Sequence, residues 1–184
     1  MKKLLLAALF ILCLTPLSFA QTTIAQASAD EDDYPRGEFY VGYSHLRFTT
    51  GGSTGFNGFN ASITGNVSKY VGLKFDVAGH YKSEFGDSLS VYNVLGGVQL
   101  KQNSREARVK PFAHALAGIA RFKASAGGFG DFSETGFAGV IGGGLDIRAG
   151  RRFDVRAIQV DYNPTRIVGE TNHNFRIGAG IVIH

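Results

Sequence analysis

The sequence lacks tryptophan and contains only one cysteine, one methionine and four prolines among its 184 residues. The single cysteine, Cys13, lies within the first twenty residues, so the rest of the chain has no thiol for a disulfide, a zinc site or a nucleophile. Only one apolar run approaches the length of a membrane-spanning helix, and it lies at the N-terminus. This excludes a protein with several transmembrane helices.

Residues 1–20 have the organisation of a secretory signal peptide. Two lysines precede the eleven apolar residues Leu4–Leu14, and the small residues Ser18 and Ala20 follow where signal peptidase cleaves. The apolar core is too short for a transmembrane anchor. Loss of the two lysines lowers the net charge from +4 to +2, and so weak a charge argues against nucleic acid as a partner.

Residues 21–37 contain the acidic run Asp30–Asp33 and show no helical or strand periodicity. We expect them to form a flexible acidic lead-in to one domain that spans residues 38–184. Glycine is abundant in the chain, with 25 residues, about twice the average usage. Together with the many aromatic and β-branched residues, this favours β structure over disorder.

From residue 38 onward, apolar residues alternate with small or polar ones. In the segment 70–82, Leu73 and Phe75 fall on one face, and Gly72 and Lys74 fall on the other. A period of two predicts strands. The eight expected strands are 38–48, 55–67, 70–82, 88–101, 110–124, 134–149, 153–163 and a last one that includes 175–183.

The composition of the second face predicts which face of the strands points into the barrel. This face is rich in Gly, Ala, Ser and Asn, whereas a solvated face normally carries many charged and long polar residues. Glycine weakens a solvated strand, but it fits the narrow interior of an eight-stranded barrel. We therefore predict an all-β fold, an eight-stranded antiparallel up-and-down transmembrane β-barrel with its apolar face toward lipid.

Two sets of residues follow from this phase. We expect the lipid-facing set to include Val71, Leu73, Phe75, Val77, Phe175, Ile177, Ile181 and Ile183. We expect a polar network in the lumen, formed by Lys74, Asp76, His80, Asp146, Arg148, Gln159, Asp161 and Arg176. Charges of both signs make ion pairing the expected arrangement, with Asp146 and Arg176 as one candidate pair.

The connections alternate in character. Residues 66–69, 102–109 and 149–152 are mostly short and polar or basic, which is typical of periplasmic turns. Residues 49–54, 83–87, 125–130 and 164–173 are rich in Gly, Ser or Asn and are expected to be the outer loops.

Four motifs carry a resemblance to a known family. They are FYVGYSHLRF at 39–48, KPFAH at 110–114, GGGLD at 142–146, and RAIQVDY at 156–162 followed by Pro164-Thr-Arg166. In this order they resemble OmpA-type outer-membrane β-barrel domain proteins. The resemblance implies an eight-stranded antiparallel barrel with a structural or porin-like role. Two departures are the lack of a peptidoglycan-binding domain after the barrel and a terminal His184 where such barrels commonly end in an aromatic residue.

The expected function is that of a non-enzymatic protein of the bacterial outer membrane with a largely closed polar lumen. We expect no cofactor, metal or catalytic residue and a monomeric chain. The expected partners are outer-membrane lipid, lipopolysaccharide and the barrel assembly machinery. One alternative is a secreted or periplasmic soluble β-barrel that binds a small apolar ligand.

A third reading is an enzyme that modifies lipid A. The candidate residues would be Ser44 with His45, Ser83 and Glu84 with His80, and Glu170 with His173. The nucleophile motif G-x-S-x-G is absent, however. The five histidines, which also include His114 and His184, lack the close spacing of metal ligands.

Overall fold

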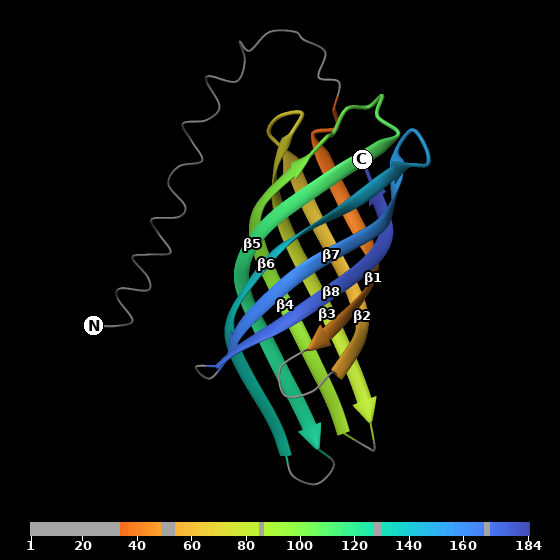
Figure 1. Ribbon diagram of the computed structural model, residues 1–184. Coiled ribbons are helices and arrows are strands. Elements are labelled where there is room, and N and C mark those ends of the chain that lie inside the picture. Colours follow the sequence, from red (N-terminus) through yellow and green to blue (C-terminus); the bar gives the residue numbers. More distant parts are fainter. Residues whose placement is uncertain (1–33, 49–53, 85–86, 127–129, 168–169) are drawn as a thin grey trace, which may run out of the picture. The chain divides into compact units, whose positions relative to one another are not determined.

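The computed structural model describes residues 34–48, 54–84, 87–126, 130–167 and 170–184. These residues form eight strands in one closed antiparallel barrel, in which each strand pairs with its neighbours in sequence and the last pairs with the first (Figure 1). The strands are β1 (Gly37–Phe48), β2 (Thr54–Asn66), β3 (Val71–Glu84), β4 (Asp87–Lys101), β5 (Val109–Ala126), β6 (Gly130–Arg148), β7 (Phe153–Ile167) and β8 (Glu170–Ile183). The eight-stranded up-and-down barrel predicted from the sequence is confirmed. No helix of the described residues is long and apolar enough to cross a membrane.

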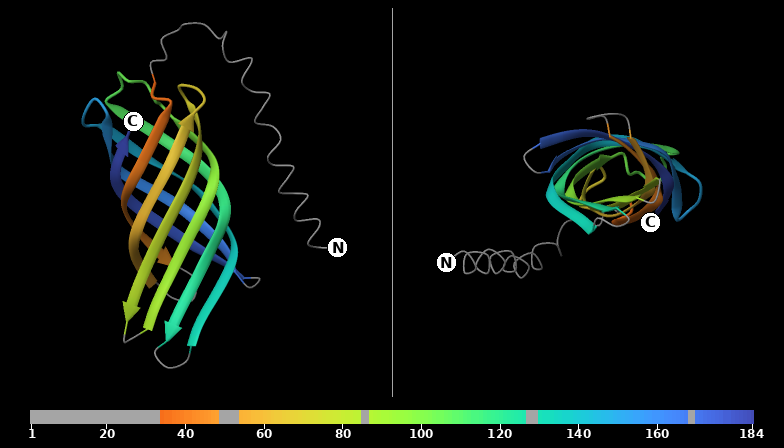
Figure 2. Two further views of the ribbon diagram at one scale, coloured as in Figure 1. Left: turned by 180° about the vertical axis from the view of Figure 1, so that it is seen from behind. Right: turned by 90° about the horizontal axis from the view of Figure 1, so that it is seen from below.

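The two ends of the barrel differ. At one end, here called the terminal end, β1 begins and β8 ends, and the connections β2–β3, β4–β5 and β6–β7 lie beside them (Figure 1). At the other, the hairpin end, β3–β4 and β5–β6 extend farthest (Figure 2). The register agrees, because β6 pairs with β7 only from Phe137 onward, although it pairs with β5 from Gly130.

The hairpin-end connections are shorter than the sequence indicated. Residues 164–173 were expected to be an outer loop, but Pro164–Ile167 belong to β7 and Glu170–His173 to β8, with Pro164 opposite His173. The expected loops at 83–87 and 125–130 are shortened in the same way. The backbone hydrogen bonds between these strands continue well past the residues at which the apolar alternation ends. Strands predicted from hydrophobicity alone are therefore too short at this end.

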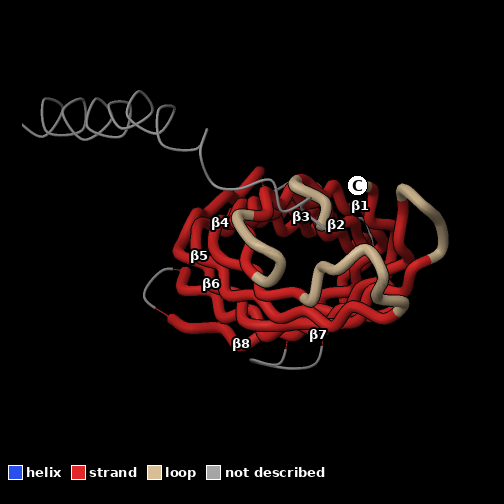
Figure 3. Tube along the Cα trace, turned by 90° about the horizontal axis from the view of Figure 1, so that it is seen from above, coloured by secondary structure: helices blue, strands red, loops and turns tan. Residues whose placement is uncertain are grey.

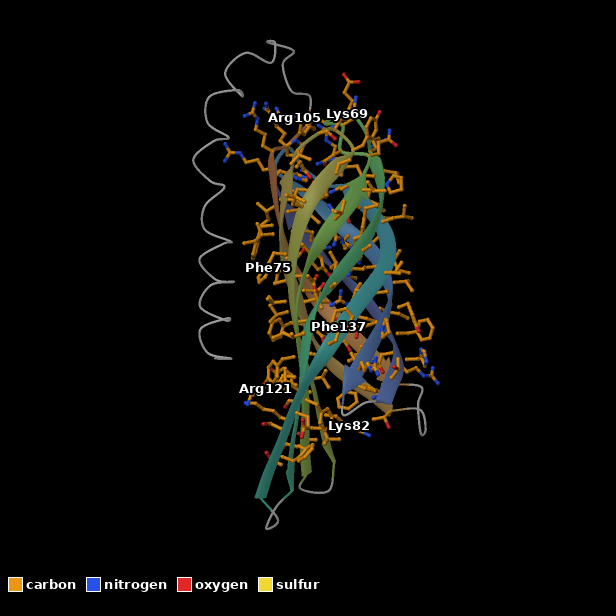
Figure 4. All side chains as sticks on the ribbon, turned by 90° about the vertical axis from the view of Figure 1, so that its left-hand side faces the viewer. Lys69, Phe75, Lys82, Arg105, Arg121 and Phe137 are labelled. Carbon is orange, nitrogen blue, oxygen red and sulfur yellow. The ribbon has the colours of Figure 1, made fainter. Side chains whose placement is uncertain are left out.

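Apolar side chains cover the outside of the barrel wall (Figure 4). Leu73 is 61% exposed and Phe75 is 52% exposed, while Lys74 between them is 3% exposed. The predicted outward residues of β8, namely Phe175, Ile177, Ile181 and Ile183, are likewise exposed. Val71 and Val77 lie on the same face of β3 and are half-buried. The outer wall is therefore apolar and the lumen is lined by the alternate residues.

One irregularity changes the phase of β7. Arg156 pairs with Gly180 of β8 and Gln159 pairs with Gly178, so two residues of β7 oppose one of β8. Such a β-bulge places two consecutive side chains on one side. Ala157 and Ile158 are both exposed, whereas Arg156 and Gln159 are both buried. Regular alternation with Gln159 and Asp161 would place Ala157 inside, and the bulge places it on the outer face instead.

Glycines in the wall leave room for large side chains in the lumen. A Cβ atom on Gly180 would meet the ring of Tyr40 and the backbone of β1, and one on Gly144 would lie 2.9 Å from Cζ of Phe112. A Cβ atom on Gly65, in contrast, would meet nothing within 4 Å. Glycine at the inward positions thus allows aromatic rings to occupy a barrel of only eight strands.

Candidate functional site

The lumen holds a charged network that is balanced in sign. Five Lys and Arg residues and five Asp and Glu residues of the described chain are buried. They are Lys74, Lys101, Lys110, Arg156 and Arg176, with Glu38, Asp76, Asp146, Asp154 and Asp161. Isolated buried charges are costly, whereas paired and hydrogen-bonded ones are tolerated. The pairing within this set therefore decides whether the lumen is stable.

Asp146 on β6 is the centre of the first group of ion pairs. Arg156 on β7 donates from Nε to Oδ1 of Asp146 at 2.7 Å and from Nη2 to Oδ2 at 3.0 Å. Lys101 on β4 lies 2.9 Å from the same carboxylate and 2.9 Å from Oε2 of Glu38. This group therefore joins four strands across the lumen with a bidentate guanidinium–carboxylate contact at its core.

Two aromatic rings enclose the guanidinium of Arg156. Its Cζ lies 4.2 Å from the centroid of the Tyr40 ring and 4.0 Å from that of Phe112. Arginine stacks favourably on aromatic faces, and the attraction increases when the pair is removed from water. Phe112 is 6% exposed, so it belongs to this inner site.

Asp161 on β7 is the centre of the second group. Arg176 on β8 donates from Nε to Oδ2 of Asp161 at 2.8 Å and from Nη1 to Oδ1 of Asp76 at 3.1 Å. His114 Nε2 donates to Oδ1 of Asp161 at 2.9 Å. Gln159 joins the two groups, because its Oε1 accepts from Arg156 at 2.9 Å and its Nε2 donates to Asp161 at 2.7 Å.

The remaining members complete the network at its edges. Lys74 lies 3.2 Å from Nδ1 of His114, and Asn60 donates to Asp76 at 2.9 Å. Seven of the eight residues expected in the lumen are buried there: Lys74, Asp76, His80, Asp146, Gln159, Asp161 and Arg176. Sequence reasoning missed Glu38, Lys101, Lys110, Asp154 and Arg156, which share the inward face with them.

Two expectations about this network are wrong. Arg148 is exposed, because it is the last residue of β6 and lies at the mouth of the barrel. Asp146 and Arg176 do not pair with each other: Asp146 binds Arg156 and Lys101, and Arg176 binds Asp76 and Asp161. The bulge in β7 turns Arg156 inward next to Asp146, and regular alternation in the sequence does not reveal that.

Hydrophobic clusters lie in the half of the lumen toward the hairpin end. One cluster contains Leu95, Leu116, Ala120, Ala138 and Val140, and a second contains Leu46, Phe56 and Val91. Phe48, Leu89 and Phe122 pack against the second cluster. Buried polar side chains, among them Asn93, Asn163, Thr165 and Asn174, lie in the same half, so the lumen there is mixed in character.

Where the structure describes them, the candidate catalytic residues take part in separate contacts. Ser44 Oγ lies 2.8 Å from Nε2 of His80, and both residues are buried in the lumen. Nδ1 of His80 has no hydrogen-bond partner among the described residues, so no acid orients this imidazole. His45 instead contacts Asn57, and His173 contacts Tyr162. The described residues contain no group of three or more metal-ligating side chains, and the side chains of Glu84 and Glu170 lie outside the described set.

A basic pocket opens at the terminal end of the lumen. Its volume is about 1050 Å³, and its lining includes Arg36, Arg105, Lys110, Arg148, Arg151 and Arg152. Among the described residues that line it, Asp154 is the only acidic one, and it binds Lys110 at 2.9 Å and His184 at 2.9 Å. His184 thus points into this mouth, while its neighbour Ile183 faces outward. Figure 3 looks onto this end, where the described loops surround the mouth.

Comparison with known proteins identifies the fold of the chain and finds no closer relationship. No family model matches the chain, and no curated protein matches it in sequence. Among solved structures, Neisserial surface protein A shares 14% identity and has a TM-score of 0.69, covering 81% of this chain and 97% of that one. Ail, the attachment invasion locus protein of Yersinia pestis, in complex with a heparin analogue, shares 19% identity with a TM-score of 0.56, covering 81% and 100%.

The N-terminal β-barrel domain of Pseudomonas aeruginosa OprF is a third similar structure, with 10% identity, a TM-score of 0.51 and coverage of 82% and 99%. These likenesses extend over nearly the whole of each known chain. The closed eight-stranded barrel of this protein is thus the same fold as that of these bacterial proteins.

Proposed function

We propose that the chain is a non-enzymatic β-barrel of the bacterial outer membrane that supports the envelope and keeps its lumen closed. The observation that carries this proposal is the reversed polarity of the barrel. Twenty-eight large hydrophobic side chains are exposed on the described part of the chain, while ten charged ones are buried in the lumen. Apolar residues facing lipid and polar residues facing the lumen are the arrangement of a membrane barrel.

The soluble alternative fits this arrangement poorly. A soluble ligand-binding barrel has an apolar interior and a polar surface. Here the exposed apolar side chains cover strands all around the wall, which in water would drive aggregation. The enzyme alternative is less favoured, because the Ser44 and His80 pair lies buried within the lumen and no described acid binds Nδ1 of His80.

Two kinds of packing support a closed lumen. The charged network connects facing strands at the level of Asp146 and Asp161, and hydrophobic clusters lie inside the half toward the hairpin end. An eight-stranded barrel has an interior just wide enough for its own side chains. A closed barrel is therefore favoured over a general diffusion pore.

Fractionation of a Gram-negative host that expresses the full chain tests the location. We expect the protein in the outer-membrane fraction, resistant to extraction with high salt and alkaline carbonate, because its apolar wall is embedded in lipid. A periplasmic marker protein, measured in the same extracts, provides the control. Recovery of the chain as a detergent-free soluble monomer would overturn the proposal.

A further inference from the structure

The basic pocket at the terminal end contains more positively charged side chains than the described acidic residues neutralise. Arg105, Arg148, Arg151 and Arg152 make no ion pair with any described acidic residue. Asp154 is the only acid among the described lining residues, and Lys110 and His184 already bind it. The four arginines are thus available to an anion from outside the barrel.

The structure of the β6–β7 turn does not depend on the arginine side chains in it. The β6–β7 turn is held by its backbone, because the amides of Ala149 and Gly150 donate to the carbonyl oxygen of Phe153 at 3.4 and 3.0 Å. The side chains of Arg151 and Arg152 are exposed and take no part in that turn. Like charges gathered at one site repel each other, so this cluster has an unfavourable electrostatic energy unless an anion binds.

The pocket adjoins the apolar wall. Phe153 lines the pocket and is also 43% exposed on the outer face, where it lies opposite Ile183, which is 47% exposed. Ile147, which pairs with Val155 in the next strands, continues the apolar surface. A ligand with a negatively charged head and an apolar tail would contact both parts, whereas a soluble anion would contact only the arginines.

We propose that this pocket binds the phosphate of an anionic phospholipid in the leaflet next to the terminal end. The inference rests on the proposed membrane location, in which this end faces the periplasm. Guanidinium groups bind phosphate oxygens through paired N–H donors. The volume of about 1050 Å³ is ample for a glycerophosphate headgroup.

Lipid retention by the purified full chain, folded in a neutral detergent, tests the site. Native mass spectrometry counts the phosphatidylglycerol and phosphatidylcholine molecules that remain bound from an equimolar mixture. We expect phosphatidylglycerol to be retained preferentially. The triple variant Arg148→Gln, Arg151→Gln, Arg152→Gln should bind it at least about tenfold more weakly, since each arginine near an anionic headgroup contributes about fivefold.

A matched triple variant at the hairpin end, Arg121→Gln, Lys123→Gln, Arg166→Gln, removes the same charge from exposed positions and should keep the preference. Equal losses in the two variants would overturn the proposal in favour of diffuse attraction. Inorganic phosphate and glycerol phosphate, added without lipid, form a further arm. If they raise the melting temperature as much as phosphatidylglycerol does, the ligand is a soluble phosphate and the lipid proposal is wrong.

A variant with Asp30–Asp33 changed to the corresponding amides tests the acidic lead-in as a competing occupant. We expect it to retain phosphatidylglycerol as the unaltered chain does. Retention that appears only in this variant would assign the pocket to the lead-in and overturn the proposal. The assay is carried out in detergent, so its failure is distinguishable from failure of the chain to fractionate with the outer membrane.

Discussion

At the scale of single residues, Arg156 is the side chain on which the lumen most depends. It makes a bidentate contact with Asp146, a hydrogen bond with Gln159, and ring contacts with Tyr40 and Phe112. Each nitrogen of its guanidinium therefore has a partner, and two aromatic rings lie close to it. This is the condition under which a buried charge is tolerated, since several partners offset the loss of hydration.

A double-mutant cycle on Asp146 and Arg156 measures this contact. We expect Asp146→Asn and Arg156→Gln each to lower the free energy of unfolding by about 3–5 kcal/mol, because each leaves a buried charge with fewer partners. The double variant should lose less than the sum, with a coupling of about 0.5–3 kcal/mol. The measurement is urea unfolding in lipid vesicles. The cycle on Asp146 and Arg176, which do not touch, is the control and should show a smaller coupling; equal couplings would contradict the assigned pairs.

At the scale of elements, the bulge in β7 determines which side chains enter the lumen. On the N-terminal side of the bulge Asp154 and Arg156 face inward, and on the C-terminal side Gln159 and Asp161 face inward. The parity of inward positions thus changes from even to odd between Arg156 and Gln159. If the same residues alternated regularly without a bulge, the two halves of the strand could not both present their polar side chains to the lumen.

Deletion of single residues in β7 tests this role. Removing Ala157 should leave a regular strand in which Arg156 and Gln159 still face inward, so we expect a folded barrel that is destabilised by about 1–3 kcal/mol. Removing Val160, from the regular part of the strand, should turn Asp161 to the apolar outer face of the barrel and prevent folding. Resistance to protease in vesicles reports folding. A folded barrel after deletion of Val160, or none after deletion of Ala157, would show that the bulge has been misassigned.

The sequence was sufficient to predict the strands and insufficient to predict the side-chain contacts between them. Strict alternation around Leu73 and Phe75 predicted both the strands and the outward face, because a period of two follows directly from strand geometry. The partners of Asp146 were not predictable, since they depend on the register of four strands and on a bulge without a sequence signal. Arg148 follows the same alternation as Asp146, but it lies at the barrel mouth, where the lumen no longer encloses it.

At the scale of the whole molecule, the lumen contains two kinds of packing. The charged network lies nearer the terminal end, and two hydrophobic clusters, which contain Leu95 and Leu46, lie among buried polar side chains nearer the hairpin end. An ion that crosses the barrel would have to displace paired charges in the first part and pass packed hydrophobic side chains in the second.

Planar-bilayer recording tests this closure. We expect the folded chain to show no large, stable conductance steps, because ion pairs and packed hydrophobic side chains occupy the interior. The variant Leu95→Ala, Leu116→Ala should also remain closed, since the charged network is intact. A general porin recorded under the same conditions provides the positive control. Large, stable steps from the unaltered chain would contradict the closed lumen.

The contact between Arg176 and Asp76 joins residues 100 positions apart in the sequence. Arg176 is the only one of the ten buried charges that β8 supplies. Before β8 is added, the interior would therefore hold four cations against five carboxylates, and Asp76 and Asp161 would lack their guanidinium partner. The last strand, β8, closes the barrel by pairing with β1, and its Arg176 also neutralises the interior. The incomplete barrel without β8 is therefore an electrostatically unfavourable intermediate. Wall closure and charge neutralisation are expected to occur as one cooperative step of assembly.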